Sequence, residues 1–311
     1  MKSLLLLFAA LFASAPARAG SAGANSALFL RSEPTARMFA MGGITTALDN
    51  DLGALFLNPA GLGGIPNASA AVSLWTGLDN ISKYNFISTA LNAGEWGVFS
   101  VSYLGYDSGS EEINELDGSS RQVILQKDSA LALGWGHAVA DWLYAGGQIK
   151  RVNSRLAETY SDSAFTYDAG IMLKAPDDGL SLSAGVQNAG GGLSYISEAD
   201  PLPQFLYAGV GAKIRLSEWG GEAGDILLGA DVRKPRDEAE LDGGMGFEYT
   251  WGMLAVRGGI KRVAGELAFT AGGGLKWKGV GFDYGFQPAG ALNQTMQKFT
   301  LSAAFNPNFF Q

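Results

Sequence analysis

The chain has 311 residues, no cysteine and a formal net charge of −8 at pH 7. The acidic balance argues against nucleic acid as a partner, and the missing cysteines exclude a disulfide scaffold. Hydrophobic residues make up 47% of the chain and charged residues only 17%, against about 25% in an ordinary soluble domain, so we expect that much of the surface does not face water.

Residues 1–19, MKSLLLLFAALFASAPARA, have the order of a secretory signal peptide. Lys2 precedes an apolar run from Leu4 to Ala13, and small residues follow up to Ala19. A membrane anchor is the alternative, but the run is shorter than the roughly 20 apolar residues that a spanning helix needs. We therefore expect export and cleavage after Ala19. No later run is long enough for a helical span either.

Residues 20–66 precede the first predicted strand, and residues 35–62 among them do not alternate like a strand. Residues 35–62 read TARMFAMGGITTALDNDLGALFLNPAGL. Gly42 and Gly43 permit a sharp bend or a close backbone approach. Residues 49–57 are expected to form one or two helical turns, with Asp49 or Asn50 as the N-cap and with Leu52, Leu55 and Phe56 on one face.

The Asn58-Pro59 pair is expected to end this helix, because the residue before a proline is pushed out of the helical region. We interpret residues 20–66 as a plug at the periplasmic mouth of a barrel; a plain N-terminal cap without a gating role is the alternative. The motif that carries this interpretation is Gly42, Gly43, Asp49, Asp51, Leu55, Phe56, Asn58, Pro59, Ala60, Gly61 and Leu62. Asp49 to Gly53 resembles the start of a calcium loop, but the third ligand position and the closing Glu are missing, so a capping role is favoured.

From residue 69 onward the side chains alternate with a period of two. In VGFDYGF, residues 280–286, the four large apolar residues share one face, and Asp283 with two glycines occupies the other. We predict fourteen strands, at about 69–77, 82–92, 96–106, 123–136, 142–153, 164–175, 180–189, 204–216, 225–234, 241–250, 253–262, 266–277, 279–287 and 296–305. An even number of strands near ten residues long is typical of an outer-membrane barrel.

The expected fold is therefore an all-β membrane β-barrel of 14 antiparallel strands, over residues 67–306, with a tail at 307–311. Its polar face becomes the lumen, and the long connections at 107–122, 154–163, 190–203 and 288–295 become outer loops. Seven tryptophans at strand ends are expected in interfacial girdles: Trp75, Trp96, Trp135, Trp142, Trp219, Trp251 and Trp277. A soluble sandwich or propeller is the alternative fold.

The N-terminal motif resembles that of the PorV/PorQ-type outer-membrane proteins, which are related to the FadL long-chain fatty-acid transporters. The matching residues are Ala36 to Gly43, then Ala47, Asp49, Asp51, Ala54, Leu55 and Phe56, and finally Asn58 to Leu62. This resemblance implies a barrel that contacts exported protein or the type IX secretion machinery. FadL-type transporters are usually well over 400 residues long and have a larger hatch and apolar outer loops.

The longest predicted loop is acidic and has no apolar ligand groove, which favours protein contact. Glu111, Glu112, Glu115 and Glu158 are the candidate contact residues. The alternatives are a FadL-like passive transporter of hydrophobic small molecules, and a structural or adhesive barrel. The expected location is the outer membrane of a Gram-negative-type bacterium, with membrane lipid and secreted proteins or secretion-system components as partners.

No enzymatic activity, metal or cofactor is predicted. His137 is the only histidine, so a site with several histidine ligands is excluded, and this residue falls near the expected periplasmic rim. A serine–histidine pair for an outer-membrane lipase would need to lie near the outer leaflet instead.

Overall fold

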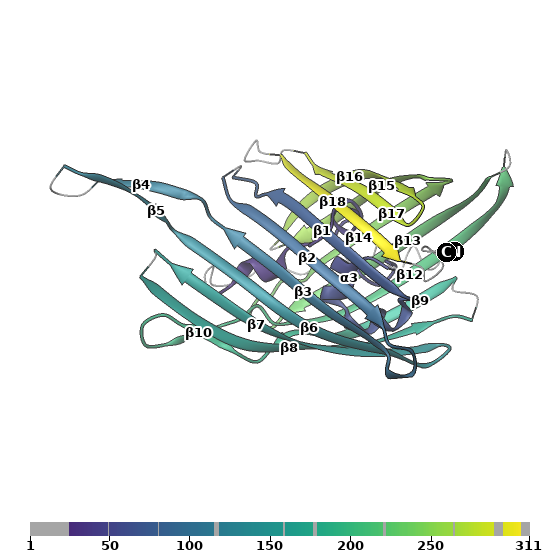
Figure 1. Cartoon of the computed structure of the whole chain (residues 1–311), viewed down its shortest axis with the longest axis horizontal. Coiled ribbons are helices and arrows are strands. Elements are labelled where there is room, and N and C mark those ends of the chain that lie inside the picture. Colours follow the sequence, from purple (N-terminus) through teal and green to yellow (C-terminus); the bar gives the residue numbers. More distant parts are fainter. Residues whose placement is uncertain are drawn as a thin grey trace.

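The computed structural model describes residues 25–48, 50–79, 81–114, 118–157, 159–176, 179–219, 222–263, 265–288 and 295–305. The described strands form one closed antiparallel barrel of fourteen, as predicted (Figure 1). The barrel strands are β1 (Ala68–Thr76), β2 (Lys83–Asn92), β3 (Val98–Asp107), β6 (Gln126–Ala140), β7 (Leu143–Leu156), β8 (Tyr160–Lys174), β9 (Leu180–Ala189), β12 (Phe205–Trp219), β13 (Glu222–Pro235), β14 (Asp242–Trp251), β15 (Leu254–Val263), β16 (Glu266–Trp277), β17 (Val280–Gln287) and β18 (Met296–Phe305).

The barrel closes where β1 pairs with β18, in a register that runs from Ala68 opposite Phe305 to Trp75 opposite Lys298. Closure removes the free sheet edges that would otherwise leave backbone groups unpaired in lipid. Strands β6, β7 and β8 are 15, 14 and 15 residues long, so they extend further than most of the others. The predicted long loop at 154–163 is therefore wrong, because β7 and β8 continue the alternation and leave only residues 157–159 between them. Tight turns such as 252–253 and 278–279 mark one end of the barrel, here called the short-turn end; the opposite end is the long-loop end.

Two predicted loops contain small hairpins. The connection at 107–122 holds β4 (Ser110–Asn114), which pairs with β5 (Ser120–Ile124), and the connection at 190–203 holds β10 (Gly192–Ser194), which pairs with β11 (Ala199–Pro201). The β4–β5 hairpin projects beyond the barrel wall at the long-loop end (Figure 1). The sequence did not reveal these hairpins, because their strands are short and one of them consists wholly of exposed residues.

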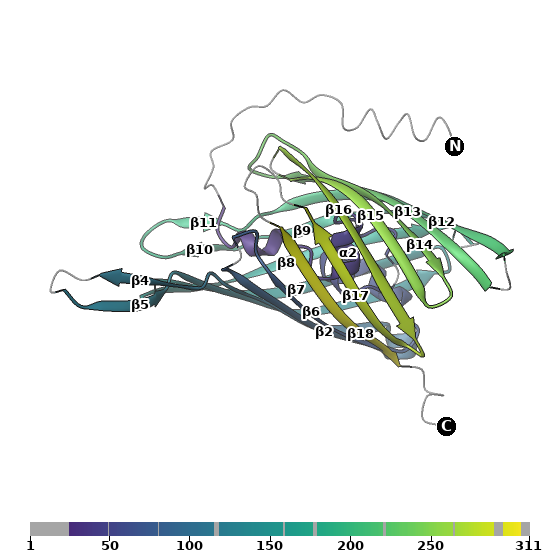
Figure 2. The same cartoon turned by 90° about the horizontal axis from the view of Figure 1, so that it is seen from above.

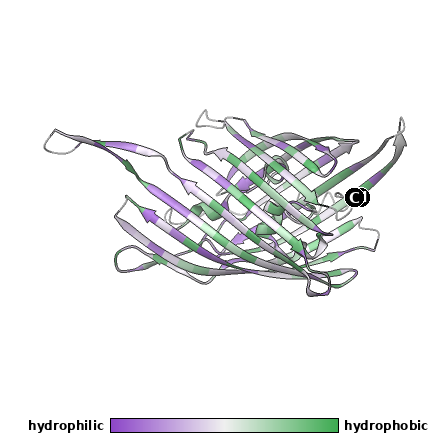
Figure 3. Cartoon of the chain, viewed as in Figure 1, coloured by the Kyte–Doolittle hydropathy of each residue, from purple (hydrophilic) through white to green (hydrophobic). Residues whose placement is uncertain are grey.

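Alternating burial along the strands separates an outer face from a lumen face. Val256 and Phe282 point outward and are 59% and 47% exposed, whereas the neighbouring Arg257 points inward and is 6% exposed. Figure 3 shows apolar and polar positions alternating along the strands. Since a water-facing barrel would not expose such a belt, the outward face is suited to lipid. No helix among the described residues is long and apolar enough to cross a membrane.

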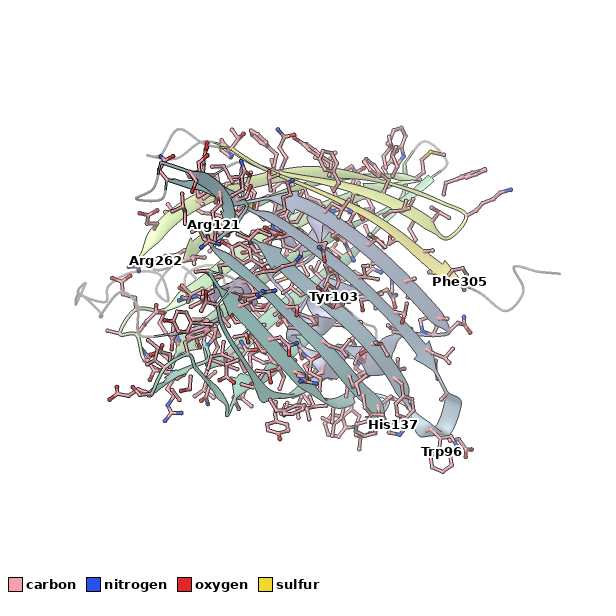
Figure 4. The ribbon with its side chains drawn as sticks, turned by 60° about the vertical axis from the view of Figure 1, so that its left-hand side comes forward. Trp96, Tyr103, Arg121, His137, Arg262 and Phe305 are labelled. Carbon is pink, nitrogen blue, oxygen red and sulfur yellow. The ribbon has the colours of Figure 1, made fainter. Side chains whose placement is uncertain are left out.

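The predicted tryptophan girdle exists at the short-turn end. Five tryptophans there have exposed side chains: Trp96, Trp135, Trp142, Trp251 and Trp277. Trp75 contradicts the prediction, because it points into the lumen near the long-loop end, where it is 5% exposed and stacks on Tyr84 at 5.0 Å. The side chain of Trp219 lies outside the described part. Figure 4 shows Trp96 at one end of this wall and Arg121 toward the other.

Candidate functional site: the plugged lumen

The N-terminal segment runs through the lumen from the long-loop end to the short-turn end. Near its start, the Ser26 backbone N–H donates to Pro201 O in the β9–β12 connection, and near its end the Asn92 side chain donates to Ile65 O. The prediction that this segment lies only at the periplasmic mouth is therefore wrong, because the segment extends through the whole lumen. The elements on this path are η1 (Leu28–Arg31), α2 (Ala36–Ala40), α3 (Leu52–Leu57) and η2 (Pro59–Gly64). Figure 2 shows α2 inside the ring of strands. Outside this path, one further 3-10 turn is η3 (Gly94–Trp96).

Asp51 caps α3. Its Oδ1 accepts hydrogen bonds from Gly53 N and Ala54 N at 3.0 Å and from Thr35 Oγ1 at 2.6 Å. The predicted caps were wrong: Asn50 adopts a left-handed φ of 56° and precedes the cap, and Asp49 lies outside the described residues. Capping by this acidic run is nevertheless confirmed, because a carboxylate oxygen satisfies two N–H groups that have no partner within the helix.

The helix ends where the Asn58-Pro59 pair predicts. Asn58 N donates to Ala54 O as the C-cap, and Pro59 begins η2. All six residues of α3 are buried, so Leu55 and Phe56 do not define a single apolar face. The helix is enclosed on every side, which a surface cap would not be.

Glycines in the barrel wall let the plug backbone lie directly on the strands. A Cβ placed on Gly244 would lie 1.8 Å from Gly42 O, and one on Gly246 would lie 2.3 Å from Met41 O. Gly42 and Gly43 themselves have φ values of 72° and 76°, so the predicted bend and close approach are both confirmed.

The motif's later residues make the same kind of contact on the opposite wall. A Cβ on Gly146 would lie 2.2 Å from Pro59 O, and one on Gly136 would lie 2.6 Å from Leu62 Cβ. The motif's Ala60 is fully buried, and a Cβ on its Gly61 would lie 2.5 Å from Leu55 Cδ2.

Inward polar side chains satisfy the plug's backbone. Thr45 donates to Asp231 through both its N–H and its hydroxyl, and Thr270 Oγ1 accepts from Gly42 N at 3.1 Å. Further along, Gln148 donates to Phe56 O and Gln187 to Leu57 O, while Tyr207 donates to Asn58 Oδ1 at 2.8 Å. Because most of these partners replace water for buried groups, the polar lumen face is explained largely by plug binding.

Ion pairs join the plug to the wall at three levels, the first of which is Arg31 with Asp242 at 2.8 Å. Glu33 Oε1 lies 2.9 Å from Lys261 Nζ, and Lys298 Nζ donates to Glu33 O. One turn further, Arg37 pairs with Glu248 at 2.6 Å. Glu248 also pairs with Arg257, which continues to Asp283, so one plug cation is tied to a charged network in the wall.

The Glu33 contact predicts a pH dependence of plug docking. Burial alone raises the pKa of Glu33, but Lys261, Lys298 and Arg233 outweigh it and lower the pKa from 4.5 to about 2. The lowered pKa means that docking is fully stabilised above about pH 4.5 and loses this contribution, on the order of 3 kcal/mol, as pH falls toward 2. Bilayer conductance should therefore differ strongly between the wild type and Glu33→Gln at neutral pH. The difference should shrink toward zero near pH 2; a constant difference would contradict this role of Glu33.

A vestibule of about 390 Å³ lies between the plug and the wall formed by β12–β18 and β1, next to the short-turn end. Its surface carries both signs of charge, with Arg37 and Asp51 from the plug and with Lys213, Asp225 and Lys276 from the wall. Apolar groups share this lining about equally with polar ones, and the charged side chains make the space better suited to water or a polar solute than to a lipid tail.

A second groove, of about 500 Å³, lies near the long-loop end on the outer face of β2, β1 and β18, where Leu74 and Phe299 are 58% and 44% exposed. It is lined by Leu74, Trp75, Thr76, Lys83, Tyr84, Thr295, Gln297 and Phe299. The apolar and aromatic members make this groove, unlike the vestibule, suited to a small apolar molecule.

The predicted partner-contact residues are only partly described. Glu111 and Glu112 are exposed on β4 of the projecting hairpin, whereas Glu115 and Glu158 lie outside the described residues. His137 is half-buried near the short-turn end and stacks on Trp135 at 6.0 Å. Within the described ranges, no group of three or more His, Cys, Asp or Glu side chains could hold a metal ion.

No protein-family model and no curated protein sequence matches this chain. Solved structures do match it. The toluene transporter TbuX of Ralstonia pickettii has a TM-score of 0.55 at 12% identity, over 88% of this chain and 98% of that one. The toluene transporter TodX of Pseudomonas putida has a TM-score of 0.52 at 12% identity, with coverages of 86% and 96%. A FadL homologue of Pseudomonas aeruginosa has a TM-score of 0.52 at 8% identity, with coverages of 88% and 98%. The chain thus has the 14-stranded fold of FadL-like outer-membrane barrels.

Proposed function

We propose that this protein is a non-enzymatic, plugged channel in the outer membrane of a Gram-negative-type bacterium, through which small apolar molecules pass when the plug moves. The observation that carries the proposal is the plug itself, which occupies the lumen from end to end and is held by contacts that could exchange for water. The short-turn end would face the periplasm, since short turns inside and longer loops outside are the usual asymmetry. Recovery of the protein as a soluble periplasmic species would contradict this location.

The groove on the outer face of β2, β1 and β18 is the proposed entry site for the solute. Its size falls within the range of small-molecule sites, and the outward Leu74 and Phe299 offer apolar surface there. The stacked Trp75 and Tyr84 lie on the lumen side of the same strands. The proteins of similar fold named as toluene transporters support small apolar compounds as the solute class. The vestibule, with its charged side chains, would then be the exit.

Toluene flux into proteoliposomes tests this proposal. Replacing Leu74 and Phe299 together with alanine removes apolar surface from the groove, so flux at low toluene concentration should fall by about tenfold or more. The matched control is Leu133→Ala with Phe269→Ala, which changes the same residue types at outward positions away from the groove. Equal flux in the two double variants would exclude the groove, and flux no higher than in empty liposomes would exclude the channel.

The projecting hairpin favours a second candidate function, contact with exported protein or with type IX secretion machinery, as in PorV/PorQ-type barrels. Glu111 and Glu112 are exposed on β4, beyond the barrel wall. A photo-crosslinker at Glu112 should then capture an identified secreted or secretion-system protein in cells. The same group at Glu95, in the turn at the opposite end, should not. Capture from neither position, together with toluene flux, would leave the channel as the function.

A further inference from the structure

The outer wall carries a polar, basic depression directly beyond its apolar belt. On β3, β6, β7 and β8 the last row of the belt consists of Tyr103, Leu131, Arg151 and Phe165, which are neighbours in the sheet register. Tyr103, Leu131 and Phe165 are 39%, 46% and 54% exposed, so this row faces away from the lumen. Figure 4 shows Tyr103 on this wall between Trp96 and Arg121.

The next row toward the long-loop end contains only small or amide side chains: Asn85, Gly105, Ser129, Asn153 and Ser163. A Cβ on Gly105 would meet the Asn85 and Tyr103 side chains, which places all three on the outer face. These residues line a depression of about 590 Å³.

Cations border this depression on both sides. Lys127 and Arg155 are direct register partners above it, and Arg151 lies in the belt row below it. Three acids line the depression, but Asp128 and Asp162 alternate with the lumen-facing Ala130 and Ala164, so they belong to the inner face. The third, Asp107, lies 3.9 Å from Lys127, and the Lys127 side chain remains 62% exposed. Among the described residues of the outer face, Lys127, Arg151 and Arg155 therefore outnumber Asp107, on a chain with a net charge of −8.

We infer that this depression binds the phosphorylated headgroup of a lipid in the leaflet at the long-loop end. The patch is continuous with the lipid-facing belt, so a molecule at this level has its tails along Leu131 and Phe165 and its headgroup over Ser129 and Asn153. Arginine next to an apolar belt is stabilised when its side chain reaches the headgroup level, and its guanidinium binds phosphate through two hydrogen bonds. Clustered Lys and Arg side chains at such a level recognise anionic lipid.

This inference rests on the proposed membrane location but not on the channel activity, so toluene flux should be unaffected when the patch is changed. The test compares wild type with the variant Lys127→Gln, Arg151→Gln, Arg155→Gln. The matched control is Lys174→Gln, Lys276→Gln, Lys278→Gln, which removes the same charge near the short-turn end.

Native mass spectrometry in detergent, with an added bis-phosphorylated glycolipid, measures the bound fraction. Wild type and the control should retain the lipid. The bound fraction of the patch variant should be lower by at least about tenfold. A charge-conserving variant, Lys127→Arg, Arg151→Lys, Arg155→Lys, should bind, which separates lost charge from lost folding. Equal retention by the patch variant, equal binding of the dephosphorylated lipid, or displacement by inorganic phosphate at the lipid's concentration would each overturn the inference.

Discussion

Replacing Gly244 with valine is expected to push the plug off the wall and to open the barrel. The Cβ of any residue at 244 would lie 1.8 Å from Gly42 O, and this neighbour is backbone, which cannot rotate away. Docking of residues 36–48 should therefore be lost while the strands still pair, because valine suits a strand. We expect a steady conductance in planar bilayers where the wild type is closed.

The matched control for this change is Gly273→Val in β16. A Cβ at 273 meets only Ala255 O, at 3.4 Å, which is ordinary van der Waals contact. This variant should stay closed. Trypsin gives a second measurement, since cleavage after Arg37 requires a released plug. If Gly244→Val folds as a barrel and remains as closed and as resistant to trypsin as Gly273→Val, the plug does not depend on this contact.

Placing arginine at Phe282 is expected to cost about 2–4 kcal/mol of unfolding free energy, because this outward position lies within the apolar belt. Phe282 is 47% exposed and lies opposite Leu301 on β18, which is 56% exposed. The matched change is Ser129→Arg, on the outer face but beyond the belt, where the expected cost is about 0–1 kcal/mol. Urea unfolding in liposomes measures both, and equal costs would show that the belt has been placed at the wrong level.

Regular alternation made the barrel predictable from the sequence. All fourteen strands follow from a period of two, and the Asn58-Pro59 stop follows from local backbone restriction. Features set by distant partners could not be predicted. Trp75 lies on the lumen face by the same alternation, next to the outward Leu74. Its partners could not be predicted, because Tyr84, which stacks on it, and Lys298, whose Nζ lies 3.8 Å from its ring centroid, come from other strands.

The cap of α3 shows the same limit within the plug. Asp49, Asn50 and Asp51 are all suitable cap residues, and Asp51 is the one whose carboxylate also accepts from Thr35, sixteen positions earlier. The alternation predicts that the glycines of β14 face inward, but it does not predict that the backbone of Met41 and Gly42 lies against them. A run such as Gly244 and Gly246 at alternate positions is nevertheless a usable signal for close backbone approach.

The central claim, that solutes pass only when the plug moves, is tested most directly by locking the plug with a disulfide. Thr46 Oγ1 and Ser183 Oγ lie 2.5 Å apart, so Thr46→Cys with Ser183→Cys would join the plug to β9 in a chain that has no other cysteine. The oxidised protein should carry toluene at least about tenfold more slowly than the same protein after reduction, and the reduced protein should match the wild type. Equal flux before and after reduction, with the disulfide verified by mass, would contradict the account.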